Sequence, residues 1–220
     1  MIDISISSEL KELWPGIALG CIQARVNVES SSTELSEELD NCCEVLMKTI
    51  NLEDLSSQPR IKDGREAYKK LGKSPGKYRS SSEALIRRVL QGKGVYKVNN
   101  IVDINNLISM KSQFPAGSYD INNLMPYVTL IKAPEGAQYK GIGKELINIE
   151  NLPVLSDGEG PFGSPTSDCE RAMITEEAKE IIMCIYSFSS KKGLEEYMDY
   201  GCELLEKYAR GQDFETRIVE

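Results

Sequence analysis

The feature that most constrains the fold is an apolar segment rich in β-branched residues, GIALGCIQARVNV, at residues 16–28. A run of this composition predicts a buried strand inside a sheet, with Gly20 marking a bulge or a close approach of another element. Residues 2–6 alternate isoleucine with polar residues and predict a shorter strand before it. Residues 33–50 carry apolar side chains at helical spacing after a run of serines, which predicts a helix that packs on the sheet.

Further along the chain, helices and strands are mixed. Helices are predicted from Pro59 to Gly72, from the cap at Ser81 or Ser82 to Gly92, and over residues 191–210, while residues 99–110 predict a helix or a loop followed by a helix. Strands are predicted at 127–136 with a turn, at 145–157 and at 178–188. Residues 211–220 are expected to be loose. The pattern predicts a single α+β domain over residues 1–220, with a barrel-like, largely antiparallel sheet flanked by helices.

The composition excludes several kinds of chemistry. The chain has no histidine among its 220 residues, which removes the commonest general base and most transition-metal sites. Its six cysteines form no CxxC pair, so we expect reduced core thiols, no metal and no cofactor. The first residues lack the pattern of a signal peptide, and no apolar run is long enough to span a bilayer. We therefore expect a cytoplasmic protein with no membrane partner.

Positive charge is concentrated in one segment of an acidic chain. Residues 60–97 carry twelve Lys and Arg against three acidic residues, a net charge of +9 in a chain whose net charge is −8. Such a segment is expected where one face meets RNA phosphate, and no DNA partner is expected. The alternative is a pair of solvated helices. The candidate RNA contacts are Arg65, Lys73, Lys77, Arg79, Arg87 and Arg88. The RNA hypothesis requires the arginines among them to share one exposed face, whereas pairing with interior carboxylates would make them structural.

Two other segments are candidates for a ligand site. The segment VYKVNNIVDINNLISM holds two Asn pairs around Asp103, and the loop GEGPFGSPTSD at residues 158–168 combines glycines with small hydroxyls. Such groups either line a cavity or tie neighbouring backbone together, and the loop alone is equally typical of a surface turn. Asp103 is a candidate general base or a buried carboxylate that accepts backbone hydrogen bonds. The candidate substrate-binding residues are Asn99, Asn100, Asn106, Gly163, Ser164, Thr166, Ser167 and Asp168.

Three strings carry a resemblance to a known family. They are VNNIVDINNLISM followed by Phe114, Pro115 and Tyr119-Asp120, the upstream run REAYKKLGKSPGKYRSSSEALIRRVLQGKG, and the downstream run GIGKELINIENLPVLSDGEGPFGSPTSD. Together they resemble free-standing relatives of the tRNA-editing domain of the bacterial phenylalanyl-tRNA synthetase β subunit. The resemblance extends from about residue 16 to residue 188 and includes none of the synthetase's aminoacylation modules. It therefore implies no aminoacylating activity.

The resemblance implies a barrel-like core with helices around it and a pocket that releases a wrongly attached tyrosine from tRNA. The pocket asparagine of the family corresponds to Asn106, and its pocket histidine falls at Gly117. The partners it implies are tRNA or aminoacyl-tRNA. The leading hypothesis is a tRNA-binding module that acts on mischarged aminoacyl-tRNA in trans. The alternative is a sensor that binds a free aromatic or other amino acid and hydrolyses nothing. The first hypothesis predicts that Asp103, Asn106 and residues 163–168 converge on one concavity.

Overall fold

The computed structural model describes residues 1–220, and the predicted buried strand is one of the two inner strands of its larger sheet. This strand, β2 (Ala18–Arg25), pairs along its whole length with β9 (Glu180–Ser187) in a four-stranded antiparallel sheet of order β10-β2-β9-β3. The edges are β3 (Ala116–Asp120) and β10 (Gln212–Val219). The two inner strands are buried on both faces over most of their length, which explains why their sequences are apolar except for Gln23 and Arg25 in β2 and the two end residues of β9.

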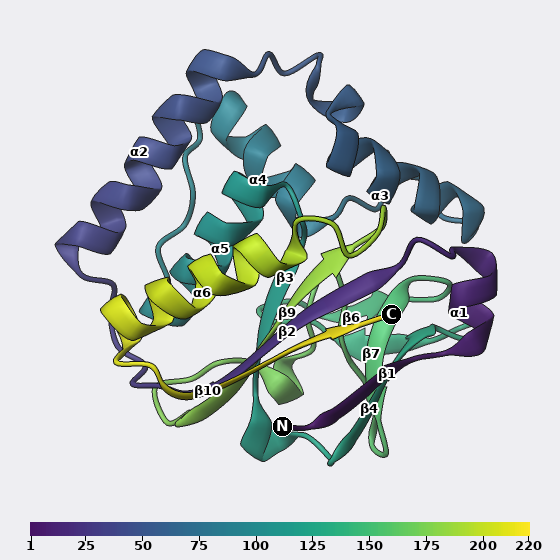
Figure 1. Ribbon diagram of the computed structural model, residues 1–220. Helices are drawn as coiled ribbons and strands as arrows, with labels where there is room; N and C mark the ends of the chain where they lie inside the picture. The colour runs from purple at the N-terminus through teal and green to yellow at the C-terminus, as the bar shows by residue number, and fades with distance from the viewer.

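Side chains of β2 and β9 alternate between two cores. Ile22 and Met183 belong to a core shared with helices, whereas Cys21 and Tyr186 belong to a second core shared with another sheet. Figure 1 shows the helices α2, α5 and α6 on one side of the β2–β9 sheet and the strands β1, β4 and β7 on the other. The molecule therefore has a helical layer, a central sheet and an outer sheet.

The helical layer is built from helices that begin at the caps expected from the sequence or close to them. Its members are α2 (Thr33–Thr49), α4 (Ser81–Leu90), α5 (Asn100–Ser112) and α6 (Leu194–Ala209). Ser32 caps α2 by accepting a hydrogen bond from the backbone N–H of Leu35. Gly20 is a site of close approach, as predicted, because a Cβ there would lie 2.8 Å from Met198 Sδ of α6.

The outer sheet has the order β1-β4-β7-β8, and all of its pairings are antiparallel except that of β1 with β4. Its strands are β1 (Asp3–Ile6), β4 (Tyr127–Lys132), β7 (Pro153–Asp157) and β8 (Gly160–Gly163), and a small hairpin is made by β5 (Gln138–Lys140) and β6 (Leu146–Asn148). The remaining elements are α1 (Ser8–Leu13), α3 (Pro59–Lys70) and three short 3-10 helices at Leu55–Ser57, Ile121–Asn123 and Glu170–Ala172. None of the helices combines the length and the apolar character that a membrane span requires.

The fold is α+β with mainly antiparallel pairing, as predicted, but neither four-stranded sheet closes into a barrel. Two local predictions are wrong. Residues 145–157 form two strands, β6 and β7, because the chain turns at Asn151 with a φ of 58°. Residues 212–219 are not loose but form β10, which pairs with β2. This strand lies at an edge and is mostly exposed, so its sequence carries little of the apolar signal by which strands are recognised.

Candidate nucleic-acid interface and the adjoining loop

Three of the predicted RNA contacts meet at one buried carboxylate. Glu83 is 1% exposed, and its Oε1 lies 2.8 Å from Arg65 Nη1, 3.5 Å from Arg87 Nη2 and 3.7 Å from Arg79 Nε. Only Arg65 is close enough to donate a hydrogen bond to it. We call these four residues the Glu83 cluster. The three arginines share one place on the molecule but pair with an interior carboxylate, which is the structural arrangement that the sequence analysis set against the RNA hypothesis. Only their surplus charge is left to support RNA binding.

Local sequence explains why the cluster forms. Ser80, one residue before the predicted cap, accepts a hydrogen bond from the backbone N–H of Glu83, which places Glu83 in the first turn of α4. Negative charge is favourable at this positive end of the helix. Arg79 and Arg87 are four residues before and after Glu83 and so lie beside it, while Arg65 reaches it from α3.

The Glu83 cluster carries more positive charge than its carboxylate neutralises. Three guanidinium groups face one carboxylate, and the arginine side chains remain 25%, 38% and 28% exposed for Arg65, Arg79 and Arg87. The Nε atoms of Arg79 and Arg87 are buried and have no hydrogen-bond partner, so they offer nothing to a ligand in solvent. The surplus positive charge of the partly exposed guanidinium groups is what phosphate oxygens can neutralise.

The other three predicted RNA contacts surround aromatic rings and form no ion pair. The guanidinium carbon of Arg88 lies 3.9 Å from the ring centre of Tyr96. The ammonium groups of Lys73 and Lys77 lie 4.4 and 5.6 Å from the ring centre of Tyr78. Basic groups therefore alternate with exposed or half-exposed rings around α4, a pattern typical of surfaces that bind single-stranded nucleic acid.

The loop at residues 163–168 lies directly against the N-terminus of α4. The backbone N–H of Ser81 donates a hydrogen bond to the carbonyl of Pro165 over 2.6 Å, and the Tyr68 hydroxyl of α3 lies 2.8 Å from Thr166 Oγ1. Within the loop, Ser164 Oγ accepts hydrogen bonds from the N–H groups of Thr166 and Ser167. The loop is therefore ordered, and it adjoins the Glu83 cluster.

Asp168, the last residue of the loop, is held in place by buried tyrosines. Its Oδ1 accepts hydrogen bonds from the Tyr119 hydroxyl at 2.9 Å and from the N–H of Ser164 at 3.0 Å, and Tyr119 in turn contacts the Tyr186 hydroxyl at 2.9 Å. Burial raises the pKa of Asp168 to about 6, although both hydrogen bonds favour the ionised form. Burial also raises the pKa values of Tyr119 and Tyr186, so both stay protonated near neutral pH.

A small cavity of about 150 Å³ opens between the loop and the β5–β6 hairpin. Ser164, Thr166 and Ser167 line it from the loop, and Tyr78 and Lys144 line it from other segments. Lys144 Nζ lies 3.3 Å from Ser167 Oγ. Three predicted substrate-binding residues therefore share one cavity, whereas Asp168 is held behind them and Gly163 lies at the end of β8.

The predicted site residues of α5 lie elsewhere and are mostly engaged in backbone contacts. Asn99 caps α5 through the N–H of Val102, and Asn100 binds the carbonyls of Asn27 and Tyr208 and the N–H of Glu29. The amide of Asn106 is partly exposed and forms no hydrogen bond. No residue of α5 lines the small cavity, so the joint concavity with residues 163–168 stays a prediction.

Asp103, the candidate general base, is fully buried. Its oxygens accept hydrogen bonds from Ser31 Oγ at 2.6 Å and from the backbone N–H of Val98 at 3.1 Å. Asp103 is thus arranged like the second of the two predicted alternatives, a buried carboxylate that accepts backbone hydrogen bonds, here at the start of a helix. We assign it no part in the chemistry proposed below.

At Gly117, where the resemblance places a histidine, there is no room for a side chain. A Cβ on Gly117 would overlap the hydroxyl of Tyr119, and a Cβ on Gly163 would overlap the same tyrosine. The Gly117 position nevertheless faces Asp168, whose Oδ2 would lie 3.5 Å from that Cβ. Tyr119 and Asp168 therefore occupy the space toward which the family's histidine would point.

A model of the B3/4 domain family matches residues 63–216. The chain belongs to the B3/4 domain family. This domain is found in the phenylalanyl-tRNA synthetase β subunit. A solved structure of an N-terminal fragment of that subunit from Pyrococcus horikoshii is similar over 99% of this chain and 50% of the fragment, with 11% identity and a TM-score of 0.48. The chain thus spans about half the length of the fragment. No curated protein matches it.

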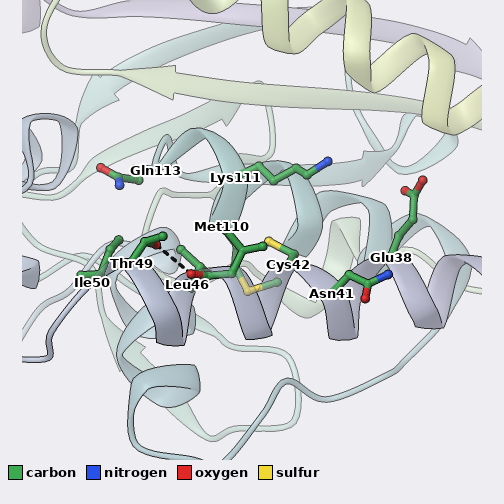
Figure 2. A pocket seen from close by; sticks show the side chains of 10 residues that line it. Glu38, Asn41, Cys42, Leu46, Thr49, Ile50, Met110, Lys111 and Gln113 are labelled. Atoms are coloured by element: carbon green, nitrogen blue, oxygen red, sulfur yellow. Dashed lines mark hydrogen bonds between the residues drawn. The ribbon is translucent and has the colours of Figure 1, made fainter.

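This B3/4 domain also has a groove of about 490 Å³ between α2 and α5, which no predicted site residue lines. Figure 2 shows Cys42, Leu46 and Met110 in the middle of its wall and Lys111 across from them, with its ammonium group pointing toward the end where Glu38 lies. Burial raises the pKa of the Cys42 thiol to about 11, so the thiol stays protonated and is a poor nucleophile. The groove is mainly an apolar surface.

Sequence reasoning missed the residues that organise this B3/4 domain's basic region. Glu83 has arginines four positions before and after it, and this spacing is a recognisable signal of a charge cluster on one side of a helix. The roles of Tyr68, Tyr119 and Tyr186 had no local signal, because they approach the loop from α3, β3 and β9.

Proposed function

We propose that the chain is an RNA-binding module that holds the aminoacylated end of a tRNA. The observation that carries this proposal is the hydrogen bond from Ser81 N–H to the carbonyl of Pro165, because it joins the Glu83 cluster to the loop and its cavity. Membership of a family found in the phenylalanyl-tRNA synthetase β subunit supports tRNA as the partner.

In this proposal the Glu83 cluster binds phosphate. Its three arginines exceed its one carboxylate, and the segment that carries them has most of the chain's clustered positive charge. Arginine forks match phosphate geometry, and their pre-arrangement by Glu83 reduces the conformational entropy lost on binding. The acidic remainder of the chain disfavours contact elsewhere, so the RNA is directed to this one face.

The aminoacyl group would enter the small cavity beside the loop. The cavity is below the range of about 300–1,000 Å³ that is usual for drug-sized ligands, so it suits a small group. Ser164, Ser167 and Lys144 supply a few fixed polar atoms around otherwise apolar walls that include Ile147 and Leu152. These few polar atoms would fix the orientation of a ligand, while the apolar walls would supply most of its binding energy.

We extend the proposal to hydrolysis of the aminoacyl ester in trans, with Asp168, which lies behind the residues that line the cavity, as the proton acceptor through one bridging water. Its pKa of about 6 is closer to neutrality than that of an ordinary aspartate, and its Oδ2 forms no hydrogen bond within the chain. A water oxygen would bond to the ester carbonyl carbon while its proton passes to Asp168. The bond from that carbon to the ribose oxygen then breaks, and Asp168 returns the proton to that oxygen, which leaves a ribose hydroxyl and the free amino acid.

Binding is tested by fluorescence anisotropy with labelled tRNA at several salt concentrations. The double variant Arg79→Ala/Arg87→Ala should weaken binding and should make the slope of log K against log salt shallower by about 1 to 2, because two phosphate contacts are lost. Arg217→Ala is the matched control, since Arg217 pairs with Asp3 on the surface away from the cluster. An unchanged slope in the double variant would exclude the cluster as the phosphate site.

Hydrolysis is tested by incubating the protein with a panel of misacylated tRNAs and following amino-acid release. Asp168→Asn should abolish release while leaving tRNA binding within about twofold, because binding rests on the arginines. If wild-type protein binds free amino acids by calorimetry but neither binds nor deacylates tRNA, the module is a sensor and the RNA proposal is wrong.

A further inference from the structure

An aromatic ring stands exposed in the middle of the basic segment. Tyr96 lies in the loop between α4 and α5 and is 68% exposed. Lys93 and Lys97 are exposed on either side of it in sequence. Large aromatic rings usually bury much of their area in a core or an interface. An exposed ring surrounded by basic side chains is suited to bind a partner that has a flat surface and negative charge.

The ring of Tyr96 is held by Arg88. The guanidinium carbon lies 3.9 Å from the ring centre, and the same guanidinium donates to the carbonyl of Lys93 over 3.3 Å. The arginine is therefore anchored to the loop that it supports. A stacked arginine limits the motion of the ring and places a positive charge beside it, which lowers the entropy lost when a base stacks there.

A second ring lies at the other end of α4. Tyr78 is half-buried, two residues before the cap Ser80, with Lys73 and Lys77 near its ring. It also lines the small cavity with Ser164 and Thr166. This ring is placed to contact a group that lies immediately outside the cavity.

We propose that Tyr96 and Tyr78 stack on unpaired nucleobases of the bound RNA, so that the module takes a single-stranded end rather than a duplex. This inference rests on the proposed function. The seven steps along α4 from Ser81 to Arg88 span about 10 Å at 1.5 Å per residue. At about 3.4 Å per nucleotide of a stacked strand, that distance corresponds to about three nucleotides. The Glu83 cluster, near the start of α4, would hold phosphates of the same strand.

The experiment compares two labelled RNA oligomers of equal length and charge, one with bases and one abasic throughout, by anisotropy. Tyr96→Leu should weaken binding of the base-bearing oligomer about tenfold, because stacking on one base is lost, and should leave the abasic oligomer unchanged. Tyr96→Phe keeps the ring and should bind like wild type. Tyr78→Leu, with Tyr78→Phe as its control, should show the same selectivity to a smaller degree because its ring is less exposed.

The outcomes separate this inference from the proposed function. An equal effect of Tyr96→Leu on both oligomers, or none on either, overturns stacking, as does tighter binding of an RNA duplex of the same length than of the single strand. If Arg79→Ala/Arg87→Ala still weakens tRNA binding in that case, the phosphate site stands without stacking. If wild-type protein binds neither oligomer nor tRNA, both proposals fail. Circular dichroism melts of the tyrosine variants verify that they are folded.

Discussion

Two of the buried carboxylates pair with arginine, and they are neutralised in opposite ways. In the Glu83 cluster, three arginines face one carboxylate. At the end of β7, one arginine serves two acidic groups: Arg171 forms two hydrogen bonds with Asp157, at 2.9 and 3.1 Å, and pairs with Glu159 at 3.2 Å. The side chain of Asp157 is 0% exposed and that of Glu83 is 1% exposed, so burial does not distinguish them.

The partners and the exposure of the arginines distinguish a structural ion pair from a surface that can bind an anion. Arg171 also donates to the carbonyls of Asn123 and Gly160, so its donors are used up in tying three segments together. The arginines around Glu83 keep partly exposed side chains and a surplus of positive charge. A buried ion pair with balanced donors is a structural tie, whereas one with surplus cations retains the capacity to bind an anion.

The largest effect is expected from Arg171→Leu. This change leaves Asp157 fully buried without its cation, and such a loss destabilises proteins by about 3–5 kcal/mol. Urea denaturation measures it, with Arg217→Leu as the control at an exposed pair that is worth about 0–1 kcal/mol. RNA binding by the folded fraction should not change. If stability is unaffected, Arg171 is not the structural tie that the geometry indicates.

A smaller loss is expected from Glu83→Gln. It removes the carboxylate that holds three cations together, but those cations are partly exposed, so solvent offsets the repulsion and the loss should be about 2 kcal/mol. Arg79→Leu should cost less than about 1 kcal/mol, because Arg65 and Arg87 still face Glu83. Urea melts of both variants beside Arg171→Leu test the ranking. Equal losses for Arg79→Leu and Arg171→Leu would erase the distinction between the two sites.

A further effect concerns pH and contrasts Asp157 with Asp168. Burial acts to raise the pKa of Asp157, but hydrogen bonds from Arg171 and from backbone N–H groups together lower it below 3.8, so its stabilisation is present above that pH and is lost as pH falls further. Asp168 has the opposite sign. Its pKa rises from 3.8 to about 6 on folding, so the folded state binds more protons in that range and stability falls as pH rises through it.

Asp168→Asn should therefore remove a decline in the free energy of unfolding between about pH 4 and pH 6, relative to wild type. Thermal or urea melts across that range measure the difference. A wild-type curve that is flat relative to the variant would mean that the carboxyl is not buried in solution, and the proposed proton acceptor would lose its distinguishing property.

The elements that could be predicted from sequence are those whose signals are local. The helix that begins after Ser32 and the strand within residues 178–188 carry a cap and an uninterrupted apolar run, and both are present in the structure. The edge strand β10 could not be recognised, because its stability comes from pairing with β2, some 190 residues earlier, rather than from its own composition.

For the site, the sequence singled out two segments that lie side by side in the structure, and their part in binding stays a prediction. The basic residues and the loop at 163–168 do adjoin each other, but through a contact between Ser81 and Pro165 that no local pattern indicates. The asparagines at the start of α5 were conspicuous in the sequence because they tie a helix start to two distant segments. Amide-rich composition alone does not distinguish such ties from a ligand pocket.

The overlap of Tyr119 with any side chain at Gly117 or Gly163 has a consequence for the evolution of this site. The three positions can change only together: a histidine at 117 becomes sterically possible once residue 119 is small, and a tyrosine at 119 requires glycine at both 117 and 163. A side chain at 117 or 163 can therefore be accepted in this chain only together with a smaller residue at 119, because the buried phenol fills the space that such a side chain needs.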